Sequence, residues 1–437
     1  TVSPRTSNSA TSTSSSSTAA DPAASPRAPP RAGAPPRLLP PGVRGYPRRA
    51  VPRLRERALA LSLSLGTCLG LACAPDLPSS GRIASTRILG FRTDVITPLF
   101  PDDPPDAGVR CQALPFEEVR LTPFMVTPTG PLDIAGPDFD PIWIACNLGP
   151  AQGLFACLKD ALPLDLDTLP ECPVPSFADI DPMAMSLAEP PSPCRLGDDG
   201  SDDGRQDLVV PFTTNVLLGG ALEVTMISQA PGSPDTRACA EALLGKADDL
   251  PNDCLYGVTR VSIGPLEKLL SLAQMFGFML PAELGTAPDP EDIPDGDRNP
   301  RITSFRVSRV ADDGSLTDLG EQPRGATIQV KPNETLQIDT ETPETDLQTY
   351  PVAINNGSGD IGSETQTERL DGSWYRTFGT LLSGGSDDPK SYNQWTLEQG
   401  ADDEDELPPD DRATLYYVLR DSRLGIDWWW LNVEVVP

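Results

Sequence analysis

The sequence predicts a mostly β protein, in which a disulfide-bearing β domain with helical inserts is followed by a β-sandwich. Three observations support this fold class. There are 50 prolines in 437 residues, and proline disfavours long helices because it lacks the amide donor and clashes with the preceding turn. Short segments of alternating apolar and polar side chains recur along the chain. Seven cysteines gather in one stretch, residues 111–254.

The acidic composition argues against a nucleic-acid partner. The chain carries 63 acidic and 34 basic residues, for a formal net charge of −29, and such a chain repels phosphate groups. Histidine is absent, which removes the usual base of catalytic triads and the commonest zinc ligand. We therefore expect a protein that is not an enzyme.

Residues 1–50 are rich in Ser and Thr and then in Pro and Arg, without a hydrophobic period. This composition indicates a disordered arm. The alternative is that the segment is not translated, because the first methionine is Met125 and Val51 is a candidate valine-coded start.

Residues 51–72 have the layout of a secretory signal peptide. The basic start VPRLRER precedes 15 apolar residues, from Ala58 to Ala72. A helix that spans a bilayer needs about 20 apolar residues, so this run is too short to cross one. The sequence therefore predicts export.

The apolar run ends in Gly70-Leu71-Ala72-Cys73. This end resembles the lipobox of bacterial lipoproteins, which is usually Leu, a small residue, Gly or Ala, and then Cys. Ala72 and Cys73 match, whereas Gly70 and Leu71 depart from the usual residues. The resemblance implies cleavage before Cys73 and lipidation of this cysteine, which anchors a chain in a membrane. Ala74 implies sorting to the outer membrane, and free secretion is the alternative.

Residues 73–82 are predicted to be a short tether, and residues 83–285 a cysteine-bearing, β-rich domain. Two helical patches interrupt this domain, at 236–246 and 265–279. Alternation predicts strands within residues 84–96, 116–126, 141–146, 207–214, 221–228 and 255–264.

The cysteines of this domain favour disulfides. No CxxC pair occurs, so bridges in an oxidising compartment explain them better than a four-cysteine zinc site. Short separations favour two pairs, Cys146–Cys157 and Cys239–Cys254. Because seven is odd, one thiol stays free or pairs elsewhere.

Residues 286–300 combine proline, glycine and acidic residues in one run, which predicts a linker. Residues 301–437 then hold about seven predicted strands, as an immunoglobulin-like β-sandwich does. Residues 421–425, DSRLG, are predicted to turn between the last two strands. The order of lipobox, cysteine-bearing β domain and sandwich is similar to that of bacterial surface lipoproteins with a C-terminal immunoglobulin-like domain. This resemblance implies a location and an architecture, and no reaction.

Residues 198–208 offer a candidate calcium loop. Gly204 falls at the position of such a loop where a sharp turn is needed, and the following Asp-Leu strand resembles the calcium loops of FG-GAP-type repeats. Val210 stands where the bidentate Glu is usual, and a solvated acidic turn is the alternative. The proposed ligands are Asp199, Ser201, Asp203 and Asp207, together with the carbonyl of Arg205.

Trp428, Trp429 and Trp430 lie in one predicted strand. Alternation places Trp428 and Trp430 on one face and Trp429 on the other. One face belongs to the core, and the other would offer an aromatic platform for a sugar or a protein. Core or edge packing of that other face is the interpretation that we favour.

We expect a non-enzymatic cell-envelope lipoprotein that serves as a structural or adhesive surface module, with the membrane and a surface protein or glycan as partners. The alternative is a secreted carbohydrate- or protein-binding module with a calcium-ordered loop. A carboxylate-based glycoside hydrolase is a third hypothesis, but no acid pair stands out among so many. The GxGxxG match at 357–362 lacks a following apolar helix and predicts a glycine-rich loop.

Overall fold

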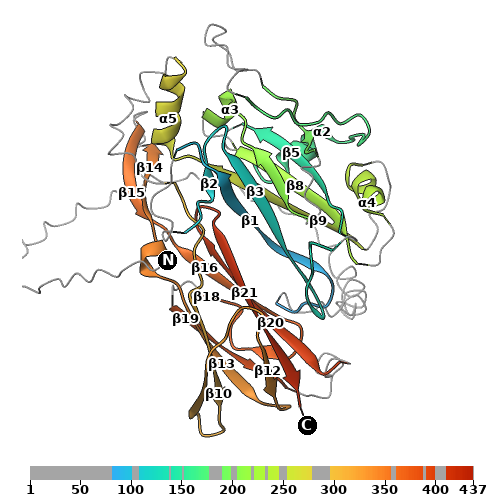
Figure 1. Ribbon diagram of the computed structural model, residues 1–437, viewed down its shortest axis with the longest axis vertical. Helices are drawn as coiled ribbons and strands as arrows, with labels where there is room; N and C mark the ends of the chain where they lie inside the picture. Colours follow the sequence, from blue (N-terminus) through green and yellow to red (C-terminus); the bar gives the residue numbers. More distant parts are fainter. Residues whose placement is uncertain are drawn as a thin grey trace, which may run out of the picture. The chain divides into compact units, whose positions relative to one another are not determined.

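The computed structural model confirms a mostly β fold for the residues that it describes (Figure 1). Residues 76–437 form one compact unit. Residues 1–80, which include the predicted signal peptide and Cys73, lie outside the described residues. The described ranges are 81–100, 108–136, 139–149, 152–176, 189–197, 204–217, 221–231, 235–245, 253–277, 296–355, 361–386, 390–398 and 410–436.

The first β domain consists of two sheets with an apolar core between them. One sheet has the order β1-β3-β4, with β7 also paired to β3, and the other has the order β2-β9-β8-β5-β6. The strands are β1 (Arg87–Thr97), β2 (Gln112–Ala113), β3 (Glu118–Thr127), β4 (Gly130–Pro131), β5 (Ile142–Leu148), β6 (Cys194–Arg195), β7 (Gln206–Val209), β8 (Ala221–Gln229) and β9 (Cys254–Ile263).

Strand β3 shows how the sequence pattern sets burial. In its first half, Val119 and Leu121 are fully buried while their neighbours are half-buried, as expected for one covered face. In its second half, the run Pro123–Val126 is buried throughout. Met125 faces the core of this domain, and Phe124 faces a second cluster shared with the sandwich. The apolar run therefore marks a strand that is covered on both faces.

Four helical segments are described in this domain, at α2 (Ala156–Ala161), α3 (Thr214–Leu217), α4 (Thr236–Leu243) and α5 (Leu266–Met275). Helix α4 begins where Asp235 accepts a hydrogen bond from the Arg237 amide, which caps its first turn. The helical patches predicted from the sequence correspond to α4 and α5. The predicted strand 207–214 is shorter than expected, because β7 ends at Val209 and α3 begins at Thr214.

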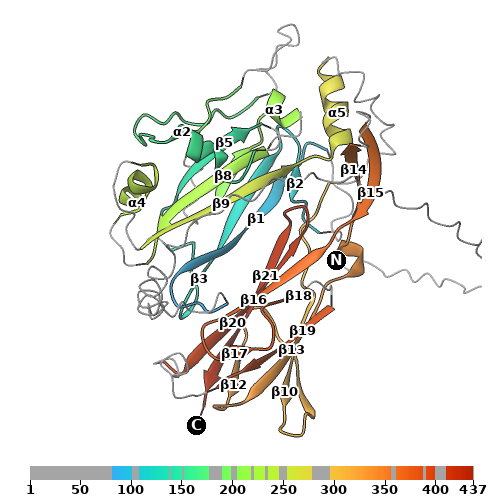
Figure 2. The same ribbon diagram turned by 180° about the vertical axis from the view of Figure 1, so that it is seen from behind.

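The second β domain is a sandwich of two five-stranded sheets, seen from opposite sides in Figures 1 and 2. One sheet has the order β11-β10-β13-β19-β17 and the other β12-β21-β20-β16-β18. The strands are β10 (Ser304–Val310), β11 (Leu316–Glu321), β12 (Thr327–Val330), β13 (Thr335–Glu341), β16 (Leu370–Arg376), β17 (Thr380–Leu381), β18 (Gly385–Ser386), β19 (Lys390–Thr396), β20 (Arg412–Asp421) and β21 (Ile426–Val435).

The topology confirms the predicted immunoglobulin-like arrangement. Strands β10-β13-β19-β17 follow the A-B-E-D order of that fold, and β16-β20-β21 follow its C-F-G order. Trp374 on β16 is buried in the core, where immunoglobulin domains carry their strand-C tryptophan. Trp395 is also fully buried, and its ring nitrogen donates to the Phe378 carbonyl at 2.8 Å. The sheets are thus held together by a tryptophan-rich core.

The turns and hairpins around the sandwich partly follow the sequence. The predicted DSRLG turn joins β20 and β21, which pair from Arg420↔Ile426 onward. A hairpin of β14 (Thr349–Asn355) and β15 (Ile361–Thr367) was not predicted. Strand β15 starts inside the GxGxxG match, so a strand and not a helix follows the glycines. Residues 357–360 of that match lie outside the described residues.

The two β domains meet in an apolar cluster that we call the joint. Strands β1 and β3 supply one side of the joint and β20 and β21 the other. Phe124 of β3 stacks on Trp428 of β21, with ring centroids 4.8 Å apart and ring planes 6° apart. The joint consists of Ile83, Leu89, Phe124, Val126, Tyr416, Val418, Ile426 and Trp428.

Polar contacts border the joint. The Asn299 side chain donates to the Thr93 carbonyl at 2.8 Å and accepts from the Ile426 amide at 2.9 Å, which links β1 to β21. Arg92 lies 3.4 Å from the Asp427 carboxylate. Residues 296–300 were expected to end a linker, yet Asp297 and Asn299 are almost fully buried. The segment that connects the two domains is therefore held by hydrogen bonds to groups of both domains.

The predicted tether also ends in a contact. The Gly81 carbonyl accepts a hydrogen bond from the Arg376 amide at 2.9 Å, and Ile83 is buried in the joint. Among the described residues, no helix combines the length and the apolar character needed to cross a membrane.

Candidate functional site at the joint

Five polar side chains from distant parts of the sequence meet beside the joint, and we call them the acid–thiol cluster. Cys111 immediately precedes β2, and Asp297 comes from the segment 296–300. Glu368 lies two residues before the start of β16. Asp421 ends β20, and Arg423 lies in the turn before β21. The Cys111 sulfur and one carboxylate oxygen each of Asp297 and Asp421 lie within 4.8 Å of one another.

Backbone hydrogen bonds hold these side chains in place. The Asp297 carbonyl accepts from the amides of Cys111 and Gln112, at 2.9 and 3.2 Å. Asp421 Oδ1 accepts from the amides of Arg423 and Gly425, at 2.7 and 2.8 Å. A carboxylate that bonds the amides two and four residues later is a common way to close a turn. The turn sequence DSRLG therefore presents Asp421 to the cluster.

The cluster contains more negative than positive groups. Arg423 Nη1 lies 3.0 Å from Glu368 Oε1 and 3.7 Å from Asp297 Oδ1. Its Nη2 donates to Gln112 Oε1 at 2.7 Å, and its guanidinium lies over the Tyr350 ring. One guanidinium thus faces three carboxyl groups. Burying such an excess of negative charge is costly unless protons or a cation compensate it.

Burial raises the pKa of Asp297, Asp421 and Cys111. Burial raises the pKa of Asp297 to about 8, and the nearby Asp421 adds to the shift while Arg423 opposes it. Burial also raises the pKa of Asp421 to about 6, although the hydrogen bonds from the backbone amides of Arg423 and Gly425 lower it. The Cys111 thiol is fully buried, and burial together with the Asp297 charge raises its pKa well above the ordinary value. Without a bound cation, the thiol is therefore protonated and unreactive at neutral pH.

Two carboxylate oxygens of the cluster lack a hydrogen-bond donor. Asp421 Oδ2 and Asp297 Oδ1 are buried, and no described group donates to either. The Cys111 thiol donates to the other oxygen of Asp297, with the sulfur 3.3 Å from Oδ2. Asp297 is fully buried and Asp421 is 9% exposed. The arrangement can therefore accept a positively charged group.

The sequence predicted none of these residues as a site. The odd cysteine number predicted that one thiol stays free or pairs elsewhere, and among the described cysteines the free thiol is Cys111. The other members come from a predicted linker, a strand end and a hairpin turn, more than a hundred residues from Cys111. No local spacing connects them, so only the tertiary fold reveals the cluster.

The candidate calcium loop is only partly described. Asp199, Ser201 and Asp203 lie outside the described residues. Gly204 has φ of +66°, which fits the predicted sharp turn. Asp207 lies on β7 and forms two bonds with Arg120, at 2.6 and 2.7 Å. The Asp207 carboxylate thus already has a cationic partner, while Arg205 directly precedes the strand.

Both faces of the strand that holds the tryptophans are packed, as we favoured from the sequence, and the alternative of a platform at Trp428 and Trp430 is corrected. Trp428 is 8% exposed and packs in the joint, with Trp430 half-buried against the same cluster. Trp429 on the other face packs on the sandwich core and stacks on Phe305 at 5.8 Å. The alternation is confirmed, but the first β domain covers the face that would have formed a ligand platform. All six tryptophans of the chain are buried or half-buried.

The disulfides partly match the prediction. Cys239–Cys254 is formed as expected, and it ties α4 to the start of β9. Cys172–Cys194 was not predicted. Cys146 is disulfide-bonded, while the side chain of its predicted partner, Cys157, lies outside the described residues.

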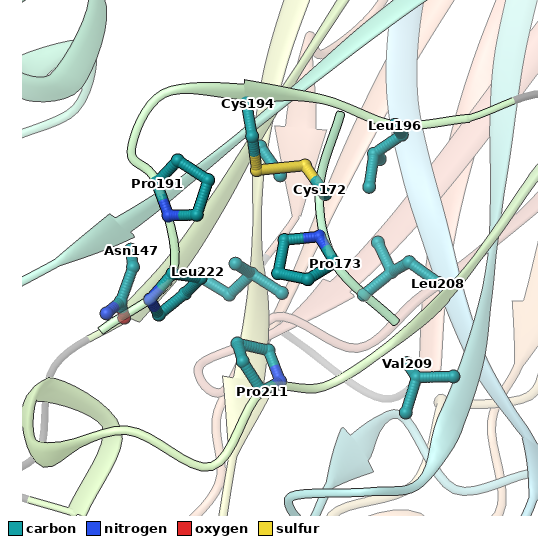
Figure 3. A pocket seen from close by; sticks show the side chains of 12 residues that line it. Asn147, Cys172, Pro173, Pro191, Cys194, Leu196, Leu208, Val209, Pro211 and Leu222 are labelled. Atoms are coloured by element: carbon teal, nitrogen blue, oxygen red, sulfur yellow. A yellow bond between two sulfur atoms is a disulfide. The ribbon is translucent and has the colours of Figure 1, made fainter. Parts of the chain in front are cut away.

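A small pocket lies beside the Cys172–Cys194 bridge (Figure 3). Its free volume is about 370 Å³, including solvent at its mouth. The Asn147 amide at its wall already donates to Glu189 and accepts from Thr213. The pocket therefore offers apolar packing without an available amide to orient a ligand, and we assign no site to it. The apolar lining includes Pro173, Pro190, Pro191, Leu196, Leu208, Pro211 and Leu222.

Comparisons with known proteins add little to this geometry. No protein-family model matches the chain, and no curated protein matches it. One similar solved chain is the dimeric latent PorU from Porphyromonas gingivalis, with 11% sequence identity and a TM-score of 0.16. The match covers 81% of this chain and 24% of that chain. At this TM-score the likeness carries no argument about fold or function.

Proposed function

We propose that the chain is a non-enzymatic structural module of the cell envelope, held at a membrane by a lipid on Cys73. The single observation that carries this proposal is the joint. It packs the disulfide-bearing first β domain against the β-sandwich. A module built in this way is rigid, so its two ends keep a fixed distance and orientation. That property suits a surface spacer or a scaffold for adhesion.

The joint is large enough to resist opening. Each fully buried side chain of the size of Leu, Ile or Phe contributes about 1.5–3 kcal/mol relative to exposure. The joint contains eight buried apolar side chains from both domains. Opening it would expose these side chains together and would also break the Asn299 bonds to Thr93 and Ile426. We therefore infer that the two domains move as one body.

The disulfides support a location outside the cytoplasm. Cys172–Cys194 and Cys239–Cys254 each close a loop within the first β domain. Bridges of this structural kind form and persist in oxidising compartments and are rare in reducing ones. This agrees with the signal peptide and lipobox inferred from residues 51–73.

The binding-module alternative has lost one of the two features that favoured it, and its candidate calcium loop is only partly described. That hypothesis placed Trp428 or Trp430 on an exposed face, but Trp428 belongs to the joint and Trp430 packs half-buried against it. Tryptophan supplies a sugar platform only when one ring face is open to solvent. A structural role requires no such face.

The test is to express the gene with its own upstream DNA in a Gram-negative host with a fatty-acid analogue. The mature N-terminal peptide is then identified by mass spectrometry in the wild type, in Cys73→Ala and in a matched control, Cys68→Ala. We expect a lipidated peptide that begins at Cys73 in the wild type and in the control, and none in Cys73→Ala. An unlipidated N-terminus elsewhere, or robust hydrolase turnover by the purified protein, would overturn the proposal.

A further inference from the structure

We propose that the acid–thiol cluster binds one divalent transition-metal ion of the zinc class, with the Cys111 sulfur and the carboxylates of Asp297 and Asp421 as ligands. This inference does not depend on the proposed function. It starts from the unequal charges of the cluster, in which Arg423 alone faces Asp297, Glu368 and Asp421. A dication would reduce the excess negative charge that the chain leaves buried.

The unsatisfied oxygens give the second observation. Asp421 Oδ2 and Asp297 Oδ1 are buried and accept no hydrogen bond from the described residues. Buried polar atoms are almost always bonded, and exceptions call for a missing partner such as an ion. The other oxygen of Asp421 is fixed by the Arg423 and Gly425 amides, which orients the carboxylate without using Oδ2.

The donor geometry suits a metal ion. The three donor atoms lie within 4.8 Å of one another, and the sulfur is 3.3 Å from Asp297 Oδ2. With Zn–S bonds of about 2.3 Å and Zn–O bonds of about 2.0–2.2 Å, tetrahedral donors lie on the order of 3.5 Å apart. Small side-chain rotations close that difference. Glu368 or a water molecule would complete the fourth position.

The donor types decide which ion fits. Calcium and magnesium take oxygen ligands only and prefer six or more of them. A thiolate with carboxylates favours zinc or a similar borderline ion. When the ion binds, a sulfur–metal bond forms, the Cys111 S–H bond breaks, and the proton passes to solvent. With the thiolate, three carboxylates, Arg423 and the dication, the cluster carries a net charge of −1, compared with −2 for the metal-free cluster with a protonated thiol.

The position of the cluster gives the ion a structural effect. Cys111 belongs to the first β domain, Asp421 to the sandwich, and Asp297 to the segment between them. Bonds from one ion to all three would clamp the joint at its polar edge. We therefore expect metal removal to loosen contacts between the domains before it affects either core.

The experiment uses the full purified chain, stripped with a chelator and titrated with Co²⁺ as a spectroscopic probe and with Zn²⁺. We expect one tightly bound ion per chain and a thiolate-to-cobalt charge-transfer band. Cys111→Ser should abolish the band, and Asp421→Asn should weaken binding by at least about tenfold. Asp318→Asn, which removes an exposed carboxylate of β11, should leave both unchanged.

A second measurement does not depend on variants that fold poorly. In the wild-type chain, alkylation of Cys111 under mild denaturant is followed by peptide mass spectrometry with and without Zn²⁺. We expect Zn²⁺ to slow alkylation of Cys111 and a chelator to reverse the protection. Absence of a bound ion, or binding that persists in Cys111→Ser, would overturn the proposal and leave protons as the compensating charge.

Discussion

Glu117 secures the buried loop before β3. It is fully buried, and it accepts from both terminal nitrogens of Arg110, at 2.7 and 2.8 Å. It also accepts from the amides of Leu99 and Leu114. The acid completes a turn that leads from Cys111 into the strand. Its neighbour Glu118 projects to the opposite side, where it accepts from Thr97 at the surface.

We predict that Glu117→Gln destabilises the protein by about 3–5 kcal/mol, because it leaves Arg110 buried without its counter-charge. Glu118→Gln is the matched control and should cost less than about 1 kcal/mol. Urea unfolding of the two variants measures the difference. Equal midpoints would mean that Arg110 finds another anion or that the loop opens to water.

Gly204 tests the turn of the candidate calcium loop. Its φ is +66°, and a Cβ at this position would collide with the Phe139 ring and the Ile134 carbonyl. We predict that Gly204→Ala costs about 1–3 kcal/mol from backbone strain alone and more from the collision. Gly314→Ala is the control, because Gly314 has φ of +80° but nothing within 4 Å of its Cβ position. Thermal unfolding should show a clearly larger loss for Gly204→Ala.

Individual residues also show what the sequence could not predict. The odd cysteine count predicted that one thiol stays free or pairs elsewhere, but not that Cys111 would face Asp297 and Asp421. The separation of 186 residues between Cys111 and Asp297 exceeds any local pattern. Local spacing can suggest a site such as the candidate calcium loop, whereas the cluster arises only when two domains meet.

Among the elements, helix α4 depends on one disulfide. The Cys239–Cys254 bridge joins its middle to β9 across 15 residues of sequence. The helix has only eight residues, too few to be stable alone in water. Its buried residues Cys239 and Ala240 belong to a cluster with Ile144 of β5, Ile227 of β8 and Leu158 of α2.

We predict that the double variant Cys239→Ala, Cys254→Ala loses about 3 kcal/mol of stability, as a 15-residue loop implies. Hydrogen exchange should rise in residues 236–243 and stay unchanged in the sandwich strands. The control is Cys172→Ala, Cys194→Ala, which should affect the segment around the pocket and leave α4 protected. Faster exchange throughout the chain would show that the bridge supports the whole domain instead.

The strands fall into predicted and unpredicted groups for a physical reason. Half-buried strands such as β1 and β13 alternate apolar and polar residues, and the sequence revealed them. In the hairpin β14–β15, the first strand, TYPVAIN, does alternate Tyr350, Val352 and Ile354, and this signal was overlooked. The second strand, IGSETQT, is polar and has no periodic apolar face. Strand β11 is mostly exposed and was missed for the same reason.

For the molecule as a unit, the sequence predicted two β domains and a linker between them, but it did not predict that the domains pack on each other. The apolar runs PFMV in β3 and LYYVL in β20 do indicate that the two domains pack on each other. Both strands are buried on two faces, and a strand of an outer sheet needs that only if another layer covers it. The three consecutive tryptophans follow the same rule, because one face belongs to the sandwich core and the other to the joint.

Because the joint packs the two β domains together, we expect them to unfold as one body. Scanning calorimetry of the mature chain tests this most directly, in the wild type, in Trp428→Ala and in a control, Tyr392→Ala, which truncates an exposed ring. Removing Trp428 should cost about 3–5 kcal/mol and should act on the joint. We predict one cooperative transition for the wild type and the control, and two separated transitions for Trp428→Ala. Two transitions in the wild type, or one unshifted transition in Trp428→Ala, would contradict the account.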